Sequence, residues 1–228
     1  LLVRGARLWD GPAADIAIDR GRIAAIGSDL PAGRGAQAID ASCCLGIPGL
    51  VDGHAHLDKT LLGTPWHPHQ GGPTIRDRID NEREVLRRLE LSPETQSARL
   101  VRDMVARGTT HARTDVDVGV EVGREHLHGV LAMRESNRDW TDVEIVAFPQ
   151  SGVMIQPGTL DLLDIAVLEG PGFVGGLDPQ GIDGDTNGQL DAIFATAARR
   201  GCGIDINLHD RGEVGAAHAE LDRRHDGG

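Results

Sequence analysis

Short apolar segments alternate with helical segments along most of this chain, and that alternation limits its fold more than any other feature. A parallel sheet is expected, because strands separated by helices, at roughly 30 residues per unit, form parallel crossovers. Such a sheet either closes into a (β/α) barrel or stays open and doubly wound, and periodicity does not separate the two. The first strand, a short apolar run, is expected to be buried. The strands are predicted at 50–54, 109–116, 143–148, 173–177 and 204–208.

The helices between these strands have recognisable starts. One begins at Ser92, whose hydroxyl can accept a bond from a free backbone N–H, and Pro93 follows at the first helical position, where no N–H is needed. This helix is expected to run to about residue 107. Before it, a polar loop is expected over about 61–79, in the longest of the connections. Further helices are predicted at 125–134, 160–168, 189–200 and 214–221.

A small β unit precedes the alternating segments. Residues 1–9 have the pattern of a strand, and two further short strands are expected at 17–18 and 23–26. The tripeptide Asp19-Arg20-Gly21 is typical of a tight turn between the latter two. Another extended stretch is expected around 38–39.

Charge and hydropathy limit the partners of the chain. Its formal net charge is −12, which argues against a nucleic-acid partner, since such binding depends on clustered cations. A small neutral or cationic ligand fits better. No apolar run of about 18 residues and no charged-then-apolar leader is seen, so no membrane partner is expected and a cytoplasmic location is the default. The three cysteines, Cys43, Cys44 and Cys202, favour neither a disulfide framework nor metal ligation.

Three His-x-His pairs occur, and their contexts differ. His54 and His56 end the first strand of the alternating region, where a spacing of two places both imidazoles on one side, within reach of one metal ion. The pair at 67 and 69 fits a proline-rich loop near the mouth of such a site. The pair at 126 and 128 falls in a predicted helix, where residues two apart point in different directions, so solvent-exposed surface positions are expected.

The segment 48–60, PGLVDGHAHLDKT, resembles the first-strand motif of the amidohydrolase superfamily, and its LDKT ending is similar to the bacterial cytosine-deaminase branch. Further matches to that branch follow in order, each at a predicted strand end. They are TDVD at 114–117, VAFPQSG at 146–152, VGGLDP at 174–179 and IDINLHD at 204–210. The resemblance therefore extends over nearly the whole chain.

This resemblance implies an α/β fold: an incomplete (β/α)8 TIM barrel of about five β/α units. Residues 1–48 would form part of a small N-terminal β-sandwich and residues 49–228 the barrel units. It also implies one divalent metal ion, Zn, Fe or Mn, held by His54, His56, a fifth-strand histidine and an eighth-strand aspartate. The implied reaction is hydrolytic deamination of a small heterocyclic substrate by a metal-activated water.

Carried over residue by residue, the resemblance makes Gln150 a contact of the substrate ring and Asp210 the proton-shuttling acid. Two departures from the family pattern stand out. The expected fifth-strand histidine is Asn207, and an amide binds transition metals far more weakly than imidazole does. His209 is the possible substitute ligand. The second departure is length, since five units leave the sixth-strand histidine and eighth-strand aspartate outside the chain.

Rival assignments remain open or are set aside on specific residues. A two-metal site bridged by a carboxylated lysine is disfavoured, because the fourth strand, 173–177, has no lysine. The carboxylates of Asp115, Asp117 and Asp178 are expected to cap helices or to accept backbone N–H groups. The alternative to a hydrolase is a degenerate or truncated paralogue acting as a binding or assembly subunit. Unpaired strand edges would favour self-association, so a homo-oligomer is expected.

Overall fold

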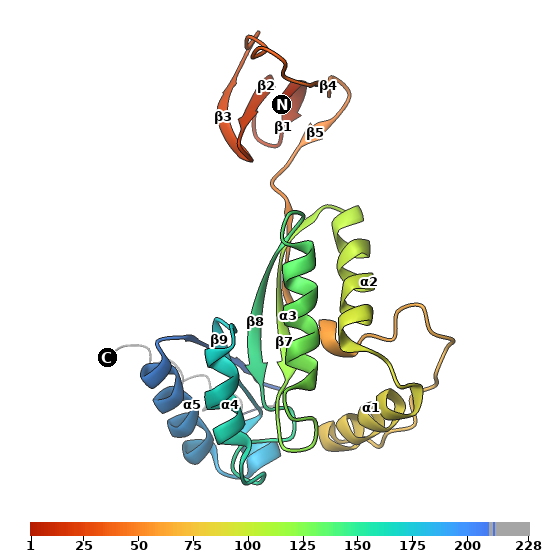
Figure 1. Ribbon diagram of the computed structural model, residues 1–228, viewed down its shortest axis with the longest axis vertical. Helices are drawn as coiled ribbons and strands as arrows, with labels where there is room; N and C mark the ends of the chain where they lie inside the picture. Colours follow the sequence, from red (N-terminus) through yellow and green to blue (C-terminus); the bar gives the residue numbers. More distant parts are fainter. Residues whose placement is uncertain (210–211, 213–228) are drawn as a thin grey trace. The chain divides into compact units, whose positions relative to one another are not determined.

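The computed structural model describes residues 1–209 and 212. The chain forms two compact units, Leu1–Gly49 and Leu50–Gly228 (Figure 1). The smaller unit carries only strands and turns. The larger unit carries the helices and a second sheet.

The small unit is a five-stranded sheet centred on β1. Arg20 and Gly21 both have positive φ, 49° and 75°, which suits the two-residue hairpin turn between β2 and β3, at the expected place. The strands β2 and β3 run antiparallel to their neighbours, whereas β4 and β5 pair in parallel with β1. Since these strands join one sheet, the β-sandwich stays a prediction. The strands are β1 (Leu2–Leu8), β2 (Ala13–Asp19), β3 (Arg22–Gly27), β4 (Ala38–Asp40) and β5 (Leu45–Gly46).

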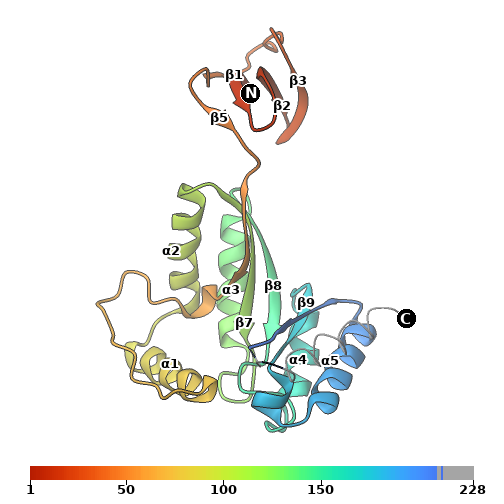
Figure 2. The same cartoon turned by 180° about the vertical axis from the view of Figure 1, so that it is seen from behind.

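The large unit is built on a parallel sheet in the order β10-β9-β8-β7-β6. Strand order follows chain order without reversal, whereas a doubly wound sheet reverses its order at a switch point. The sheet curls as half a barrel does, which is consistent with a partial TIM barrel (Figure 2). The strands are β6 (Leu50–Ala55), β7 (Thr109–Asp117), β8 (Asp142–Phe148), β9 (Phe173–Leu177) and β10 (Gly203–Asn207).

Four helices pack against this sheet and form the core with it. Ile145 of β8 and Val174 of β9 are fully buried, and they meet Leu127 and Ile193 from two of the helices. These helices lie close to the predicted ranges, and the Ser92 hydroxyl accepts the Thr95 N–H at the start of the first. The predicted helix at 214–221 lies outside the described residues. The helices are α2 (Pro93–Ala106), α3 (Glu125–Asn137), α4 (Thr159–Leu168) and α5 (Thr186–Arg200).

One further helix, α1 (Ile75–Leu89), begins within the last residues of the loop expected at about 61–79 and continues through a stretch for which no element was predicted. It begins at Thr74, whose hydroxyl accepts the Asp77 N–H while the Asp77 carboxylate accepts the Thr74 N–H, a reciprocal capping box. Ile79 is its one buried residue among those described. The helix was not predicted, although the Thr74 and Asp77 start signal is present in the sequence. A short π-helix, η2 (Pro179–Asp183), was also not predicted.

The expectation that β6 is buried is wrong. β6 lies at the edge of the described sheet, with β7 as its one partner there. Leu50 and Val51 are 49% and 66% exposed. An apolar run indicates a strand, but its burial depends on which neighbours cover it, and the local sequence does not contain that information.

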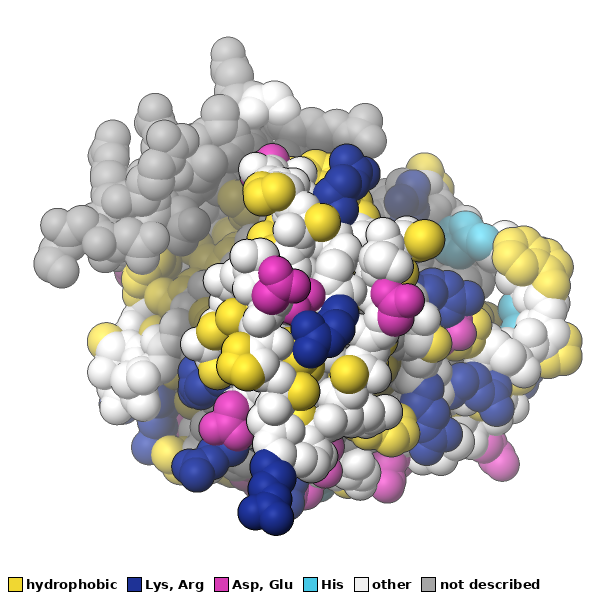
Figure 3. Space-filling view, turned by 90° about the horizontal axis from the view of Figure 1, so that it is seen from above, with side chains coloured by type: hydrophobic (Ala, Val, Ile, Leu, Met, Phe, Trp, Pro, Cys, Tyr) yellow, Lys and Arg dark blue, Asp and Glu magenta, His cyan; other side chains and the backbone are white. Residues whose placement is uncertain are grey.

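No described helix has the length and apolar character needed to span a membrane. On the described part of the face shown in Figure 3, basic and acidic side chains are interspersed. Many such charges form ion pairs across short spans, for example Arg87 with Glu84 and Arg138 with Glu135.

Candidate metal centre and adjoining cavity

The parallel register brings the predicted site residues to one edge of the sheet. Ala55 of β6 is level with Thr114 of β7, and Asn207 of β10 is level with Leu177 of β9. Because parallel strands present their carboxyl ends at the same edge, polar side chains distant in sequence meet there. This edge is where the active sites of (β/α) barrels lie.

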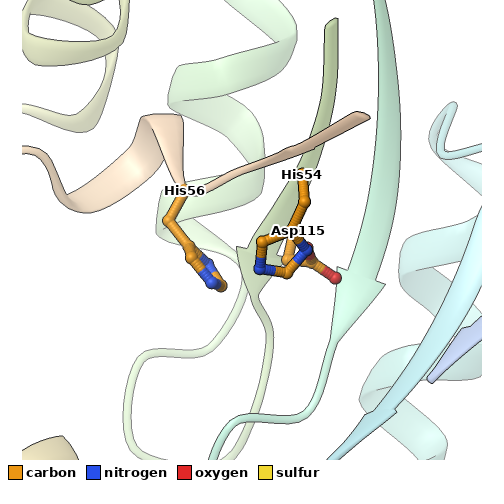
Figure 4. A group of neighbouring side chains, drawn as sticks. All are labelled: His54, His56 and Asp115. Atoms are coloured by element: carbon orange, nitrogen blue, oxygen red, sulfur yellow. The ribbon is translucent and has the colours of Figure 1, made fainter. Parts of the chain in front are cut away.

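His54, His56 and Asp115 form a compact group at this edge (Figure 4). One donor atom from each lies within 4.8 Å of the others. The His54 Nδ1 atom is 3.2 Å from Oδ2 of Asp115, and the centroids of the two imidazole rings are 5.2 Å apart. The structure therefore brings together the two histidines singled out from the sequence and adds a carboxylate that was expected to serve elsewhere.

Burial sets the charge state of these groups. Burial, assisted by the charge of Lys59, lowers the pKa of His56 to about 4, so its imidazole is neutral at pH 7 and able to bind a metal. Its Nδ1 atom is buried without a hydrogen-bond partner among the described residues. Burial raises the pKa of Asp115 to about 6; His54 and Asn207 oppose this rise and Asp205 adds to it.

Two imidazoles and one carboxylate fit a divalent metal ion. Nitrogen and carboxylate oxygen donors suit Zn, Fe and Mn alike. The unpartnered Nδ1 of His56 is the kind of buried polar atom that a ligand would satisfy. β9 contains no lysine that could be carboxylated to bridge two ions.

A buried turn holds His56 and Lys59 in place after β6. This turn is η1 (Leu57–Lys59), and the Leu57 N–H donates to the Thr114 hydroxyl at 3.0 Å. The Asp58 carboxylate accepts the Asp117 N–H at 3.1 Å and contacts Nδ1 of His126 at 2.8 Å. The turn is thus fixed to β7 and α3 at once.

His126 corrects a prediction made from the helical spacing. It was expected on the solvated surface, but its side chain is 17% exposed and pairs with Asp58. Burial disfavours the charged imidazole, yet the hydrogen bond and charge of Asp58 raise the pKa of His126 above its ordinary value. His128 is 58% exposed, as expected, and contacts Glu169.

A cavity of about 170 Å³ adjoins the group of ligand atoms. Gln150, 4% exposed, donates from Nε2 to Glu82 at 2.8 Å. The Lys59 Nζ lies 3.1 Å from Glu82 Oε1 and also donates to Gln150 Oε1. The cavity lining comprises His56, Lys59, Ile75, Arg78, Ile79, Glu82, Phe148, Gln150, Leu177, Asn207 and His209.

Glu82 was not recognised from the sequence, because α1, the helix that carries it, was not predicted. Residues of the same helix also line a larger cavity of about 970 Å³, and Lys59 and Glu82 line both cavities. Arg83 fixes α1 to the end of β7 through Asp117 at 2.8 Å. Arg76 adds a bond to the Ile182 carbonyl, also at 2.8 Å.

Asn207, His209 and Asp210 are the candidate residues predicted at the end of the fifth strand. Asn207 ends β10 and lines the small cavity, but it lies outside the group of ligand atoms formed by the described residues. The His209 imidazole is 57% exposed, and its backbone N–H donates to Asp178, in keeping with the role expected for that aspartate. Asp210 lies outside the described residues.

Asp117, at the end of β7, was also expected to cap a helix or to accept backbone N–H groups. Asp117 pairs with Arg83 rather than capping a helix.

In the loop after η1, His69 contacts the Asn81 side chain of α1 at 3.3 Å. Neither His67 nor His69 belongs to the group of ligand atoms formed by the described residues.

A curled parallel sheet with imidazole and carboxylate groups at its carboxyl edge is consistent with part of a (β/α) barrel that carries a candidate metal centre. The homologues and structural neighbours of the chain are members of the amidohydrolase superfamily. No family model matches the chain.

Three similar proteins illustrate this relationship. N-isopropylammelide isopropyl amidohydrolase of Pseudomonas sp. (strain ADP) is 30% identical over 94% of this chain and 54% of its own length. The crystal structure of N-isopropylammelide isopropylaminohydrolase from Burkholderia multivorans ATCC 17616 is 42% identical with a TM-score of 0.91, over 96% of this chain and 55% of that chain. The crystal structure of a 5-methylcytosine deaminase from Klebsiella pneumoniae is 26% identical with a TM-score of 0.81, over 100% of this chain and 57% of that chain. The chain thus spans about half the length of these proteins.

Proposed function

We propose that the chain supplies a metal-binding strand end and one wall of the substrate cavity of a hydrolase that breaks the C–N bond between a nitrogen heterocycle and an amino substituent. The observation that carries the proposal is the convergence of His54, His56 and Asp115 beside the cavity lined by Gln150. The names of the similar proteins support it, since they refer to hydrolysis of N-isopropylammelide and deamination of 5-methylcytosine.

His54 and His56 would hold a single divalent ion, Zn, Fe or Mn. Such an ion lowers the pKa of bound water and so supplies a nucleophile at neutral pH. The protein's part is to keep the His56 imidazole neutral and both imidazoles oriented. Burial keeps the His56 imidazole neutral. The contacts of Asp58, which anchor η1 to β7 and α3, keep the His56 imidazole oriented.

Gln150 is the proposed contact of the substrate ring. Its amide carries both a donor and an acceptor, which suits the alternating N and N–H groups of a heterocycle edge. In the described structure these atoms face Glu82 and Lys59, so both residues would share in orienting the ring. Asp210 keeps its proposed role in proton transfer, which rests on the family resemblance.

A second candidate function is ligand binding without turnover. Asn207 favours it, because this residue stands at the end of β10 where the resemblance expects a metal-binding histidine. Under this alternative the chain would hold a heterocycle, or another subunit, without hydrolysing it. Metal content and turnover together distinguish the two.

The test uses the purified 228-residue chain loaded with Zn²⁺, Fe²⁺ or Mn²⁺. Release of isopropylamine from N-isopropylammelide and of ammonia from 5-methylcytosine would be measured. The proposal expects one bound metal per chain and amine release that His56→Ala abolishes and His128→Ala leaves unchanged. Bound metal without turnover on any substrate would favour the second candidate, and the absence of bound metal would contradict the first.

A further inference from the structure

The Asp115 carboxylate is buried at the site, and no Lys or Arg among the described residues forms an ion pair with it. Asp115 is 1% exposed, and its Oδ1 atom has no hydrogen-bond partner among the described residues. Its Oδ2 atom contacts His54. Within the described part of the chain the carboxylate accepts no backbone N–H, so it does not serve as a helix cap. Burying a carboxylate in this way is costly unless a charge compensates it.

The nearby cations are engaged elsewhere. Lys59 contacts Glu82 and Gln150. Arg113, two residues before Asp115 on β7, pairs with Glu144 at 2.8 Å and with Asp205 at 3.0 Å. A compensating charge for Asp115 therefore has to come from outside these side chains. The point within reach of His54, His56 and Asp115 is where a divalent ion would supply it.

Asn207 ends β10 and lines the small cavity beside His56. Its side chain favours the charged form of Asp115 and so opposes the rise in the pKa of that carboxyl. A hydrogen bond to a ligating carboxylate fixes its orientation, and removal of such a partner commonly weakens metal binding by about 10- to 100-fold. An amide here can orient Asp115, whereas it would be a poor ligand itself.

We infer that Asp115 is a protein ligand of the metal ion, and that Asn207 is a positioning residue that orients its carboxylate. Compared with the family pattern, the chain then lacks an imidazole ligand at the end of β10 and supplies a carboxylate ligand from β7 instead. This inference rests on the proposed function in that it requires a metal ion at His54 and His56, but it requires no turnover.

The experiment measures Zn²⁺ affinity of the full chain by chelator competition, together with the visible absorption spectrum of the Co²⁺-loaded chain. Asp115→Asn is expected to weaken Zn²⁺ binding by at least about tenfold and to change the Co²⁺ spectrum, since a ligand is lost. Asn207→Ala is expected to weaken binding by about tenfold. The matched control is Asp142→Asn, an exposed carboxylate at the opposite end of the sheet, which should change neither readout.

Two further readouts separate a ligand from a merely structural residue. The metal-free Asp115→Asn chain should unfold at the same or a higher temperature than wild type, because a buried uncompensated charge is removed; yet Zn²⁺ should raise its unfolding temperature less. In the double variant Asp115→Asn/Asn207→His, an imidazole on β10 should restore Zn²⁺ affinity to within about tenfold of wild type.

The contrary outcomes are distinct. If wild type and Asp115→Asn bind Zn²⁺ equally well and give the same Co²⁺ spectrum, the assignment of Asp115 is wrong while the proposed function stands. If the wild-type chain binds no Zn²⁺ or Co²⁺, both fail together. If the metal-free Asp115→Asn chain does not fold, Asp115 has a structural role and the inference is overturned.

Discussion

The Oδ2 atom of Asp58 lies 2.8 Å from Nδ1 of His126, and this contact joins the turn that follows β6 to helix α3. Asp58 is 3% exposed and its Oδ1 atom has no partner among the described residues. The pair therefore holds a buried charge close to His56 and Lys59. The position of the candidate metal centre depends on a residue that helical spacing assigned to the surface.

Replacing His126 should cost stability. His126→Ala removes a charge-assisted hydrogen bond to a buried carboxylate, so the free energy of unfolding should fall by about 2 kcal/mol. The control is His128→Ala on the same helix, which alters an exposed side chain and should change the free energy by less than about 0.5 kcal/mol. Urea denaturation of the metal-free chain measures both. Equal effects of the two substitutions would contradict the prediction.

Helix α1 should be held by its polar contacts more than by its core contacts. Ile79 is its one buried residue among those described, whereas Arg83 reaches Asp117 and Glu121. Arg83→Ala should therefore accelerate amide hydrogen exchange across 75–89 by about tenfold or more, corresponding to about 1.4 kcal/mol of local stability.

The control for this experiment is Arg87→Ala, since Arg87 is exposed and pairs only locally with Glu84. Exchange in α1 should stay as in wild type in that variant, and exchange in α2 should change in neither. If Arg83→Ala left the protection of α1 intact, the helix would have to be stabilised by other contacts.

The strands and the two histidines could be predicted from the sequence because the signals for them are local. Apolar runs located β7 to β10 within a few residues, and the spacing of His54 and His56 was sufficient to place both imidazoles on one side. The partial barrel was also expected, although periodicity alone had left the open sheet as an alternative. Sequential strand order, a property of the whole sheet, decides between them.

The parts that were missed depend on distant neighbours. Asp115 meets His54 because β6 and β7 align in a particular register, across about 60 residues of intervening chain that contain α1 and α2. Glu82 reaches the cavity from α1, whose one buried residue among those described is Ile79, so its position at the site depends on tertiary contacts of the helix. The exposure of Val51 likewise reflects which strands lie beside β6. The start signal at Thr74 and Asp77 and the helical spacing of Ile75, Ile79 and Leu86 could have located α1 in advance.

The exposed edge of the large sheet should promote self-association. Val51, 66% exposed, lies on the edge strand β6, where unpaired backbone groups and apolar side chains offer a surface to a second copy. Val51→Lys should lower the fraction of oligomer measured by sedimentation velocity at a fixed concentration. Val120→Lys, at an exposed loop position, is the control and should leave that fraction unchanged. A monomeric wild-type chain would show the prediction to be wrong.

Glu144 should make the stability of the sheet sensitive to acid. Its hydrogen bond from Arg113 lowers the pKa of this carboxyl below its ordinary value of 4.5. A group with a lowered folded-state pKa contributes stability that is complete above the unfolded-state pKa and is lost as the pH falls through the folded-state pKa. Wild type should therefore lose more stability than Glu144→Gln between pH 6 and pH 3. The difference should be small, because the side chain is 36% exposed. The denaturant midpoints of the two chains at a series of pH values test this, and parallel curves would contradict it.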